Sequence, residues 1–389
     1  MIIREQKITL SDTFPELLSC IPRDLQENTA FYDIETTGLG WRSSHIYLIG
    51  ILFPAEGTWT LRQWFLDRPF AEKELLADFA DFLTRYAPAR LADYNGSTFD
   101  LPYLRHKYDF YKLPVPELLS DRKTQRQTDI LRLLRPLKDR LPVSSLKLQA
   151  VEKILHTGRK DSSSGKELIE VYYRFLQNGD ADLLEHLFLH NHDDILGLLP
   201  AASLLSFSEF WRGGFCISAM EKCPQSIRFE LKPDCSLPLD FTLESLQSFC
   251  DEKETEYAGH VSCRLFFRKT TVILTVPVLA GERRLFFSDP QNYYYLPEED
   301  QAVHKSVGAF IDPSHRTQAK ASTCYRRVQG RFIPVPTTLD IPGVYSFHEK
   351  YKAKTGWIRE EDIFGITSDA LLVCIKSILD VFFSNCKVI

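Results

Sequence analysis

The segment Ile46–Phe53 (IYLIGILF) constrains the fold of this chain more than any other stretch. A continuous apolar run of this length is typical of a strand buried on both faces, because a half-exposed strand alternates apolar and polar residues. Strand-like segments precede and follow it, at Phe31–Glu35 and Trp59–Leu66. Their β-branched and aromatic residues favour strands, so we expect the three segments to form an antiparallel meander.

Helical and strand-like patterns alternate after the meander. Apolar residues at helical spacing predict a helix over Phe70–Tyr86, and a short strand follows near Leu91–Tyr94. Further elements are expected at 128–131 (a strand or the start of a helix), at 144–155 and 165–175 (helices), and at 182–205, a helix that Pro200 should kink or split. Residues before about 28 read as a lead-in with a short helix near Phe14–Ser19. This order favours an α/β fold with a mixed sheet flanked by helices.

The length of 389 residues suggests two domains. We expect a boundary near residue 205, because Ser206–Gly214 (SFSEFWRGG) reads as a linker that ends in a Gly-Gly break. Residues 206–389 then form a second, α+β domain of unknown role. Its expected elements are strands at 226–231, 261–267, 271–279 and 284–287, a helix at 298–310, a hairpin of 321–328 and 331–335 turning at Gln329-Gly330, and a helix at 368–384. Tyrosines at 293–295 and 325, with arginines at 326, 327 and 331, suit either nucleic-acid contact or core packing, so this domain is a candidate for binding the substrate or a partner.

The composition favours a cytoplasmic protein. Nine scattered cysteines without a C-x-x-C pair favour reduced thiols over a zinc ribbon or a disulfide framework. Charged residues from Arg4 to Lys7 lie where a signal peptide needs an apolar run. The most apolar helix, Ala370–Phe383, is interrupted by Lys376 and Asp380 and is not expected to span a membrane. The net charge is −5, so any contact with nucleic acid requires a local basic patch.

Two acidic motifs lie in the first half of the chain. Asp33 and Glu35 are two residues apart on a strand, so their side chains point to the same face. Two neighbouring acids repel each other unless a hard divalent cation or solvent compensates them. Asp100 follows the turn Asn95-Gly96 and falls in the first turn of a helix. The helix dipole by itself also favours an acid at that position, so Asp100 alone does not indicate a site.

The third motif is His190-Asn191-His192-Asp193-Asp194 on the long helix. Residues four apart share a helix face, so His190 lies beside Asp194. The small residues Gly197 and Ala201 continue this face and leave room for a ligand. Taken alone, the motif also fits a solvated polar face.

The three motifs together predict a two-metal site for phosphoryl transfer. Four acids (Asp33, Glu35, Asp100 and Asp194) suffice to hold two divalent cations roughly 4 Å apart, one of which generates a hydroxide nucleophile. A titratable group must accept the proton of the water, and His190 suits that role because its free pKa is near neutral.

The segments around these residues show a family resemblance. FYDIETTGL, IYLIGILF, YNGSTFDLPYLRHK, DILRLLRPLK and HNHDDILGL resemble, in this order, the DEDD 3′–5′ exonuclease superfamily of the ribonuclease H-like fold, and most of all its YprB-type branch. The resemblance covers residues 29–205 and implies a ribonuclease H-like exonuclease domain over residues 1–205. It implies two Mg²⁺ or Mn²⁺ ions, with Asp33 and Asp194 on the nucleophile-side ion. Asp33, Glu35 and Asp100 would place the other ion or its water shell.

One motif departs from the family pattern. The family places a tyrosine four residues, or a histidine five residues, before the last aspartate, whereas His190 lies four residues before Asp194. His190 is the candidate base, but the identity of the base stays open. Asp193 is a weaker alternative to Asp194 as the ligand, because Asp194 pairs better with His190.

The resemblance also implies contacts to the terminal nucleotide from Thr36, Gly38, Leu39, Asn95 and Phe99. Leu39 and Phe99 suit packing against a base and equally suit core packing. Asn95 suits a hydrogen bond to a phosphate or sugar and equally suits the turn itself. Basic residues between the second and third motifs track a phosphate backbone or form a solvated face: Arg122, Lys123, Arg126, Arg132, Arg135, Lys138 and Arg140, with Lys147 and Arg159 nearer the third motif.

The sequence therefore predicts a nuclease, a two-metal-ion-dependent 3′–5′ exonuclease that hydrolyses phosphodiester bonds of DNA or RNA. A single-stranded 3′ end is the expected substrate, and no membrane partner is expected. Two alternatives stay open: a catalytically weak binding module of a nucleoprotein complex, and an endonuclease of structured nucleic acid. The presence of all four acids counts against the first. No residue is identified that senses a 2′-hydroxyl, so DNA and RNA are not distinguished.

Overall fold

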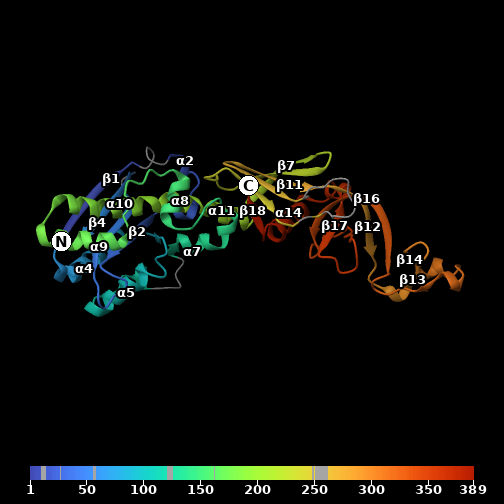
Figure 1. The fold of residues 1–389 in the computed structure, drawn as a ribbon, viewed down its shortest axis with the longest axis horizontal. Helices are drawn as coiled ribbons and strands as arrows, with labels where there is room; N and C mark the ends of the chain where they lie inside the picture. The colour runs from blue at the N-terminus through green and yellow to red at the C-terminus, as the bar shows by residue number, and fades with distance from the viewer. Residues whose placement is uncertain are drawn as a thin grey trace. The chain divides into compact units, whose positions relative to one another are not determined.

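The computed structural model describes residues 1–9, 15–26, 28–55, 58–120, 126–161, 163–247, 249 and 262–389. Of the residues considered above, Phe14, Arg122, Lys123 and Val261 lie outside this part of the chain. The chain divides into two compact units (Figure 1): Met1–Arg212 with Cys235–Leu239, and Gly213–Asp234 with Asp240–Ile389. Among the described helices, none has the length and apolar character needed to cross a membrane.

A six-stranded mixed sheet forms the centre of the first unit, in the order β1-β4-β3-β2-β5-β6. Its strands are β1 (Ile2–Ile8), β2 (Thr29–Thr36), β3 (Ile46–Ala55), β4 (Thr58–Phe65), β5 (Arg90–Asp93) and β6 (Gln127–Asp129). β2, β3 and β4 pair antiparallel, which confirms the predicted meander, and β5 and β6 add in parallel beside β2. The sequence did not predict the edge strand β1, because its mostly exposed residues lack the pattern of a buried strand.

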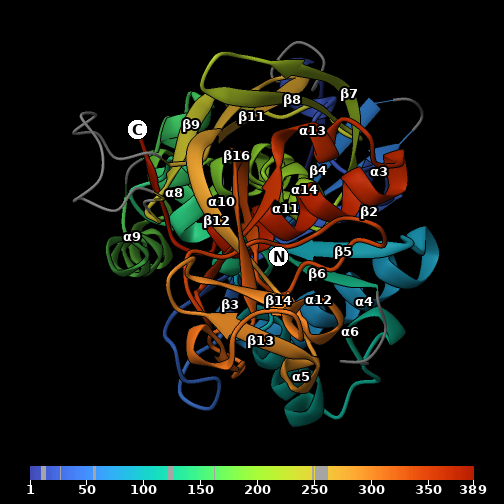
Figure 2. The same cartoon turned by 90° about the vertical axis from the view of Figure 1, so that its right-hand side faces the viewer.

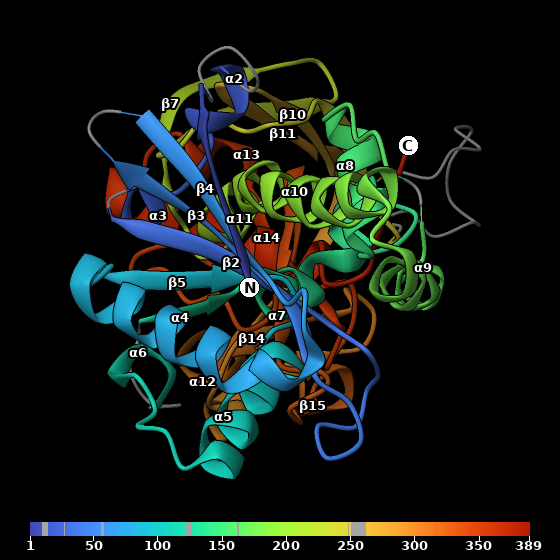
Figure 3. The same cartoon turned by 90° about the vertical axis from the view of Figure 1, so that its left-hand side faces the viewer.

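Helices cover both faces of this sheet (Figure 3). On one face lie α4 (Glu72–Tyr86) and α5 (Asp100–Tyr111), joined by a 2.8 Å hydrogen bond from the Tyr108 hydroxyl to the carbonyl of Leu76. On the other face, α10 (Ala181–Ser203) packs against β2 and β3, with α8 (Leu148–Leu155) and α9 (Gly165–Asn178) beside it. All eight residues from Ile46 to Phe53 are buried, as expected of a strand covered from both sides.

Gly50 explains how α10 comes so close to β3. A Cβ atom at this position would lie 2.1 Å from Oδ1 of Asn191 and 2.2 Å from Cδ1 of Ile195, both on α10. Such contacts are impossible, so the glycine inside the apolar run sets the distance between sheet and helix. The same contact brings the third motif next to the strand that carries the first.

Several boundaries differ from the expected ones. Residues 128–131 contain both the end of β6 and the start of α7 (Ile130–Leu134), and α8 begins at Leu148 rather than near 144. Pro200 does not split α10, which continues to Ser203. The expected linker contains a largely buried helix, α11 (Leu205–Trp211). The remaining short elements of this unit are α2 (Pro15–Leu18), α3 (Arg23–Gln26), η1 (Pro69–Ala71), α6 (Glu117–Ser120) and η2 (Arg135–Arg140).

The described part of the second unit contains three antiparallel sheets. The first, in the order β18-β9-β10-β11-β8-β7, comprises β7 (Phe215–Lys222), β8 (Ser226–Pro233), β9 (Phe241–Ser245), β10 (Arg264–Arg268), β11 (Thr271–Pro277) and β18 (Cys386–Val388). The second joins β12 (Leu279–Phe286), β16 (Tyr325–Pro336) and β17 (Thr355–Arg359), and the third joins β13 (Tyr293–Leu296), β14 (Gln301–His304) and β15 (Thr317–Gln318). β12 and β16 run as a long pair toward β13 and β14 (Figure 2). The helical elements are η3 (Pro290–Asn292), α12 (Lys305–Gly308), η4 (Pro313–His315), α13 (Glu360–Ile363) and α14 (Ser368–Phe382).

Two predictions for the second unit are wrong. Gln329-Gly330 is not a hairpin turn, because Gly330 lies inside the continuous strand β16, opposite Gly281 of β12. The expected helix 298–310 is instead a turn, β14 and the single turn α12. Asp300 has a left-handed backbone (φ 49°), which ends any helix there, and its carboxylate accepts hydrogen bonds from the hydroxyls of Tyr295 and Tyr325 at 2.6 and 2.5 Å. The hydroxyls of Tyr295 and Tyr325 are therefore used in hydrogen bonds within the fold.

Candidate active site

The first motif lies near the end of β2. Tyr32 and Ile34 are buried in the core, and the alternating residues Asp33 and Glu35 both face α10. Asn191 of α10 donates a hydrogen bond from Nδ2 to Oδ2 of Asp33 at 3.1 Å. The strand period of two therefore places both acids against one helix, as the sequence suggests.

The third motif meets the first at this contact. His190 and Asp194 are one turn apart on α10, and Nε2 of His190 lies 3.3 Å from Oε1 of Glu35 and 3.3 Å from Oδ2 of Asp194. One ligand atom from each of the three residues lies within 4.8 Å of the others. Within the described ranges, this is the one group of three or more acidic, histidine or cysteine side chains with such spacing.

Asp100 is buried at the same edge of β2. It is the first residue of α5, and its Oδ1 accepts a hydrogen bond from the backbone N–H of Ile34 at 3.3 Å. Because Ile34 lies between Asp33 and Glu35, the second motif contacts the first directly. All four predicted acids thus lie around the end of β2, supplied by β2, α5 and α10.

The turn before Asp100 is held by Asp129, which the sequence analysis missed. Asp129 ends β6 and accepts hydrogen bonds from the backbone N–H of Asn95 (3.0 Å) and from the N–H and hydroxyl of Ser97 (3.3 and 2.5 Å). The N-cap residue of α5 is Phe99, which makes no capping hydrogen bond. The parallel strand β6 therefore fixes the place where α5, and with it Asp100, begins.

The carboxylates of the site raise one another's pKa values. Burial and the charges of Glu35 and Asp100 raise the pKa of Asp33 well above its ordinary value. Burial and the charges of Asp194 and Asp100, opposed by His190, raise the pKa of Glu35 to about 7. Burial also raises the pKa of Asp100 to about 7. A bound cation would relieve this repulsion, and carboxylate oxygens are the ligands that hard divalent cations prefer.

His190 is enclosed by acids. Burial alone would lower its pKa, but the hydrogen bond to Asp194 and the charge of Glu35 outweigh burial and raise the pKa of His190 to about 9. Burial likewise opposes the ionisation of Asp161, but hydrogen bonds from His190 and Ser163 lower its pKa to about 2. Without an ion, a protonated His190 therefore offsets part of the negative charge of the site.

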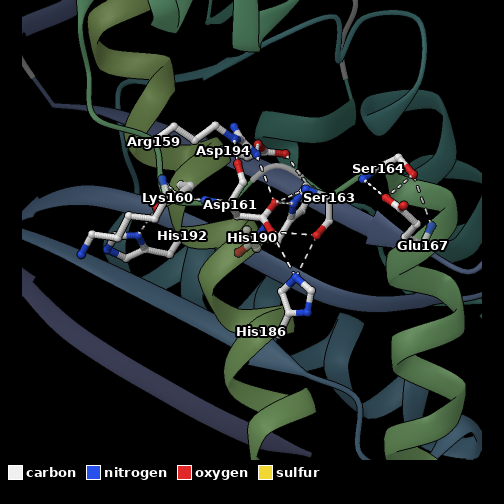
Figure 4. Close-up of polar contacts among 12 residues, drawn as sticks. Arg159, Lys160, Asp161, Ser163, Ser164, Glu167, His186, His190, His192 and Asp194 are labelled. Carbon is white, nitrogen blue, oxygen red and sulfur yellow. Dashed lines mark hydrogen bonds and ion pairs between the residues drawn. The ribbon is translucent and has the colours of Figure 1, made fainter.

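The loop between α8 and α9 supplies two further partners (Figure 4). Nη2 of Arg159 contacts Oδ1 of Asp194 at 2.5 Å, and Nη1 contacts Oε2 of Glu152 at 3.0 Å. Oδ2 of Asp161 contacts Nδ1 of His190 at 2.5 Å. Arg159 was expected to point toward a substrate and instead binds an acid of the site. No sequence signal indicates Asp161, a single acid in an irregular loop.

Two details of the third motif differ from expectation. Gly197 does not leave an open space, because a Cβ atom there would lie 2.1 Å from Oε1 of Glu152, which fills the position. Asp193, the weaker alternative ligand, is buried away from the three-residue group. Its Oδ2 accepts hydrogen bonds from the backbone N–H groups of Lys160 and Asp161 at 2.8 and 2.9 Å.

The last residue of β2 and the loop after it supply three of the residues expected to contact a nucleotide: Thr36, Gly38 and Leu39. The Thr36 hydroxyl donates to the carbonyl of Gly38 at 3.0 Å, and the Ser44 hydroxyl donates to the same carbonyl at 2.9 Å. Leu39 is 87% exposed, although it is apolar. The hydrogen bonds fix the loop, while the exposed leucine leaves an apolar surface open to a ligand.

Asn95 and Phe99 have clear structural roles. Asn95 has a left-handed backbone (φ 73°), as the turn requires, and its Oδ1 accepts a hydrogen bond from Nη2 of Arg135 at 3.0 Å. Phe99 is half-buried against the core, with its ring centroid 5.5 Å from that of Tyr103. Both structural interpretations of these residues therefore hold, and neither excludes a contact with substrate.

A cavity of about 960 Å³ opens beside the same turn. Five arginines are among the residues that line it: Arg90, Arg105, Arg132, Arg135 and Arg212. Two other members of the expected basic cluster have protein partners, because Arg126 binds Glu117 at 3.2 Å and Arg140 lies over the ring of Trp211 at 4.4 Å.

Three comparisons relate the chain to known proteins. Residues 30–205 match the family model described as the RNase H superfamily. YprB of Bacillus subtilis (strain 168), an uncharacterized protein, is 27% identical over 175 residues. That match covers 45% of this chain and 41% of YprB. The matched part is therefore less than half of the length of YprB. Among solved structures, the family B DNA polymerase of the archaeon Pyrobaculum calidifontis matches with 13% identity and a TM-score of 0.35, over 60% of this chain and 38% of the polymerase.

Proposed function

We propose that residues 30–205 form a nuclease. These residues match the RNase H superfamily and have its mixed α/β fold. The proposed enzyme uses two divalent cations, Mg²⁺ or Mn²⁺, to hydrolyse phosphodiester bonds of DNA or RNA from the 3′ end. The observation that carries the proposal is the group of four acids and one histidine around the end of β2. These residues come from three elements far apart in the chain. Burial and the charges of neighbouring acids raise the pKa values of Asp33, Glu35 and Asp100, and such a buried acidic group fits a site built for cations.

The residues of the site differ in the ligand atoms that they offer to the cations. Glu35, His190 and Asp194 offer ligand atoms that lie within 4.8 Å of one another, and Asp33 and Asp100 offer further carboxylate oxygens near the end of β2. When bound, two divalent cations supply charge stabilisation for the scissile phosphate and an acidified water. Asn191 and the N–H of Ile34 each hold one oxygen of an acid, which orients the remaining oxygen.

The surroundings of the site suit a single-stranded end. The exposed Leu39 offers an apolar contact for a terminal base, which is tolerant of sequence. Acids as well as arginines line the cavity beside Asn95, and its exposed arginines offer positive charge to the phosphates of the preceding nucleotides. We propose Arg132 and Arg135 as the first phosphate contacts, because both line the cavity and are exposed.

Degradation of end-labelled oligonucleotides tests this proposal. Single- and double-stranded DNA and RNA are incubated with the full chain and Mg²⁺, Mn²⁺ or a chelator. We expect stepwise shortening from the 3′ end with a divalent cation, and none with the chelator or with Asp33→Asn. A cooperative thermal unfolding transition of the variant, at or above the temperature of the unsubstituted chain, would show that a loss of activity is not a loss of fold.

The same assay separates the alternatives. A nucleic-acid-binding module would bind the oligonucleotide but cut none of the four substrates with any divalent ion. An endonuclease would cut a substrate whose 3′ end is blocked, whereas the proposed exonuclease would not.

A further inference from the structure

Each of the three clustered ligands has its other polar atom occupied. Oε2 of Glu35 is 3.4 Å from the hydroxyl of Tyr47. Oδ1 of Asp194 is 2.5 Å from Nη2 of Arg159. The atoms that remain, Oε1 of Glu35, Oδ2 of Asp194 and Nε2 of His190, are the ones that lie together. Three side chains thus each direct one atom to a common point and hold the other away from it.

Asp161 completes this pattern for the histidine. A carboxylate can only accept a hydrogen bond, so the 2.5 Å contact places a proton on Nδ1 of His190. In neutral His190 the lone pair then lies on Nε2, directed at Glu35 and Asp194. Asp161 is itself fixed by the Ser163 hydroxyl at 2.9 Å and by Nε2 of His186 at 3.1 Å (Figure 4). A carboxylate that holds the far nitrogen of an imidazole is the usual outer partner of a metal-binding histidine.

We infer that His190 is a metal ligand, that it forms one ion site with Glu35 and Asp194, and that Asp161 is the positioning residue that makes this possible. This inference deepens the proposed function and rests on it for the use of the ion in nucleic-acid cleavage. The site has one nitrogen and two oxygen donors. Imidazole suits first-row transition ions, whereas Mg²⁺ prefers oxygen donors and retains several waters. The Glu35–His190–Asp194 site therefore selects Mn²⁺ over Mg²⁺.

The other two acids of the active site have a different donor chemistry. Asp33 and Asp100 offer only oxygen atoms, and each has one oxygen bound to Asn191 or to the backbone of Ile34. Oxygen donors accept Mg²⁺ and Mn²⁺ alike. The selectivity for Mn²⁺ is therefore a property of the histidine-containing site alone.

Electron paramagnetic resonance of Mn²⁺ bound to the full chain, without nucleic acid, tests the inference. At one equivalent of Mn²⁺ we expect a ¹⁴N coupling from a directly bound imidazole, which excess Mg²⁺ does not remove. His190→Gln should abolish the coupling. Asp161→Asn should weaken Mn²⁺ binding about 10–100-fold, the usual cost of losing such an outer partner. His192→Ala is the matched control on the same helix, because His192 contacts Asp193 instead of the site, and it should retain the coupling.

Two results would overturn the inference: Mn²⁺ bound without a ¹⁴N coupling, or equal Mn²⁺ affinity in His190→Gln and the unsubstituted chain. Thermal unfolding of each variant checks its fold, so that weaker Mn²⁺ binding by a folded Asp161→Asn chain cannot come from global unfolding. The readout does not depend on cleavage. If the chain bound Mn²⁺ through His190 but cut no nucleic acid, the result would contradict the proposed function and would still support the ion site.

Discussion

At the scale of single residues, the site holds more negative charge than its own side chains can neutralise. Glu35 shows this best, because its side chain is only 13% exposed and two further acids raise its pKa to about 7. Arg159 and His190 neutralise part of the charge, yet Asp33 keeps a strongly raised pKa. In the absence of metal, the residues of the site should therefore lower the stability of the fold.

Replacing Glu35 tests this cost. In the folded chain Glu35 retains a proton up to about pH 7, whereas in the unfolded chain it loses the proton near its ordinary pKa. Stability therefore falls as the pH rises between these two values, and the cost is complete above pH 7. Without metal at pH 8, Glu35→Gln should raise the free energy of unfolding by about 1–3 kcal/mol.

Urea unfolding at pH 8 and pH 4.5, with a chelator present, measures this effect. The gain should be almost gone at pH 4.5, where Glu35 is protonated in the folded chain and about half protonated in the unfolded chain. If the variant were less stable than the unsubstituted chain at pH 8, this would contradict the claim that ionised Glu35 lowers the stability of the metal-free fold.

At the scale of elements, the packing of α10 on the sheet decides whether the motifs meet. Gly50 is the critical position, because any side chain there would overlap Asn191 and Ile195. Either these two side chains or α10 itself would have to shift. Asn191 binds Asp33, and α10 carries His190 and Asp194, so either shift would disturb the site.

Gly50→Ala should therefore lower the free energy of unfolding by about 1–3 kcal/mol through overpacking, and it should also weaken metal binding. Chemical denaturation and Mn²⁺ titration measure the two effects. Gly165→Ala is the matched control, since a Cβ atom at Gly165, the first residue of α9, would have no neighbour within 4 Å. Normal metal affinity in a destabilised Gly50→Ala chain would contradict the link between this packing and the site.

The sequence predicts the parts of the site that depend on local periodicity. Asp33 with Glu35 and His190 with Asp194 are fixed by the periods of a strand and a helix, and Ile46–Phe53 by its continuous apolar run. Asp129 and Asp161 lie outside the motifs, and only the tertiary fold brings them to Ser97 and His190. Gln329-Gly330 was misread because glycine marks a turn and a strand irregularity equally well.

At the scale of the whole molecule, the chain has two compact units, and the candidate site belongs entirely to the first. The described part of the second unit is built on antiparallel sheets and α14. The sequence predicts α14, β8, β10 and β11 and parts of β12 and β16, but it does not predict the other strands of this unit. It also carries no motif that assigns the unit a chemistry.

Hydrogen exchange with and without Mn²⁺ should distinguish the units. An ion that binds only the folded first unit stabilises that unit by mass action. We expect slower exchange in β2, in the first turn of α5 and in α10, with little change in β8 and β11 of the second unit. Equal protection of both units would contradict a site confined to the first.

A crystal structure of the full chain soaked in Mn²⁺, with an anomalous difference map, tests the proposed metal centre most directly. We predict two peaks about 4 Å apart, one in contact with Glu35, His190 and Asp194 and the other with Asp33 and Asp100. A map with no peak at these residues, at Mn²⁺ concentrations that saturate binding in solution, would contradict the claim that they form a metal centre.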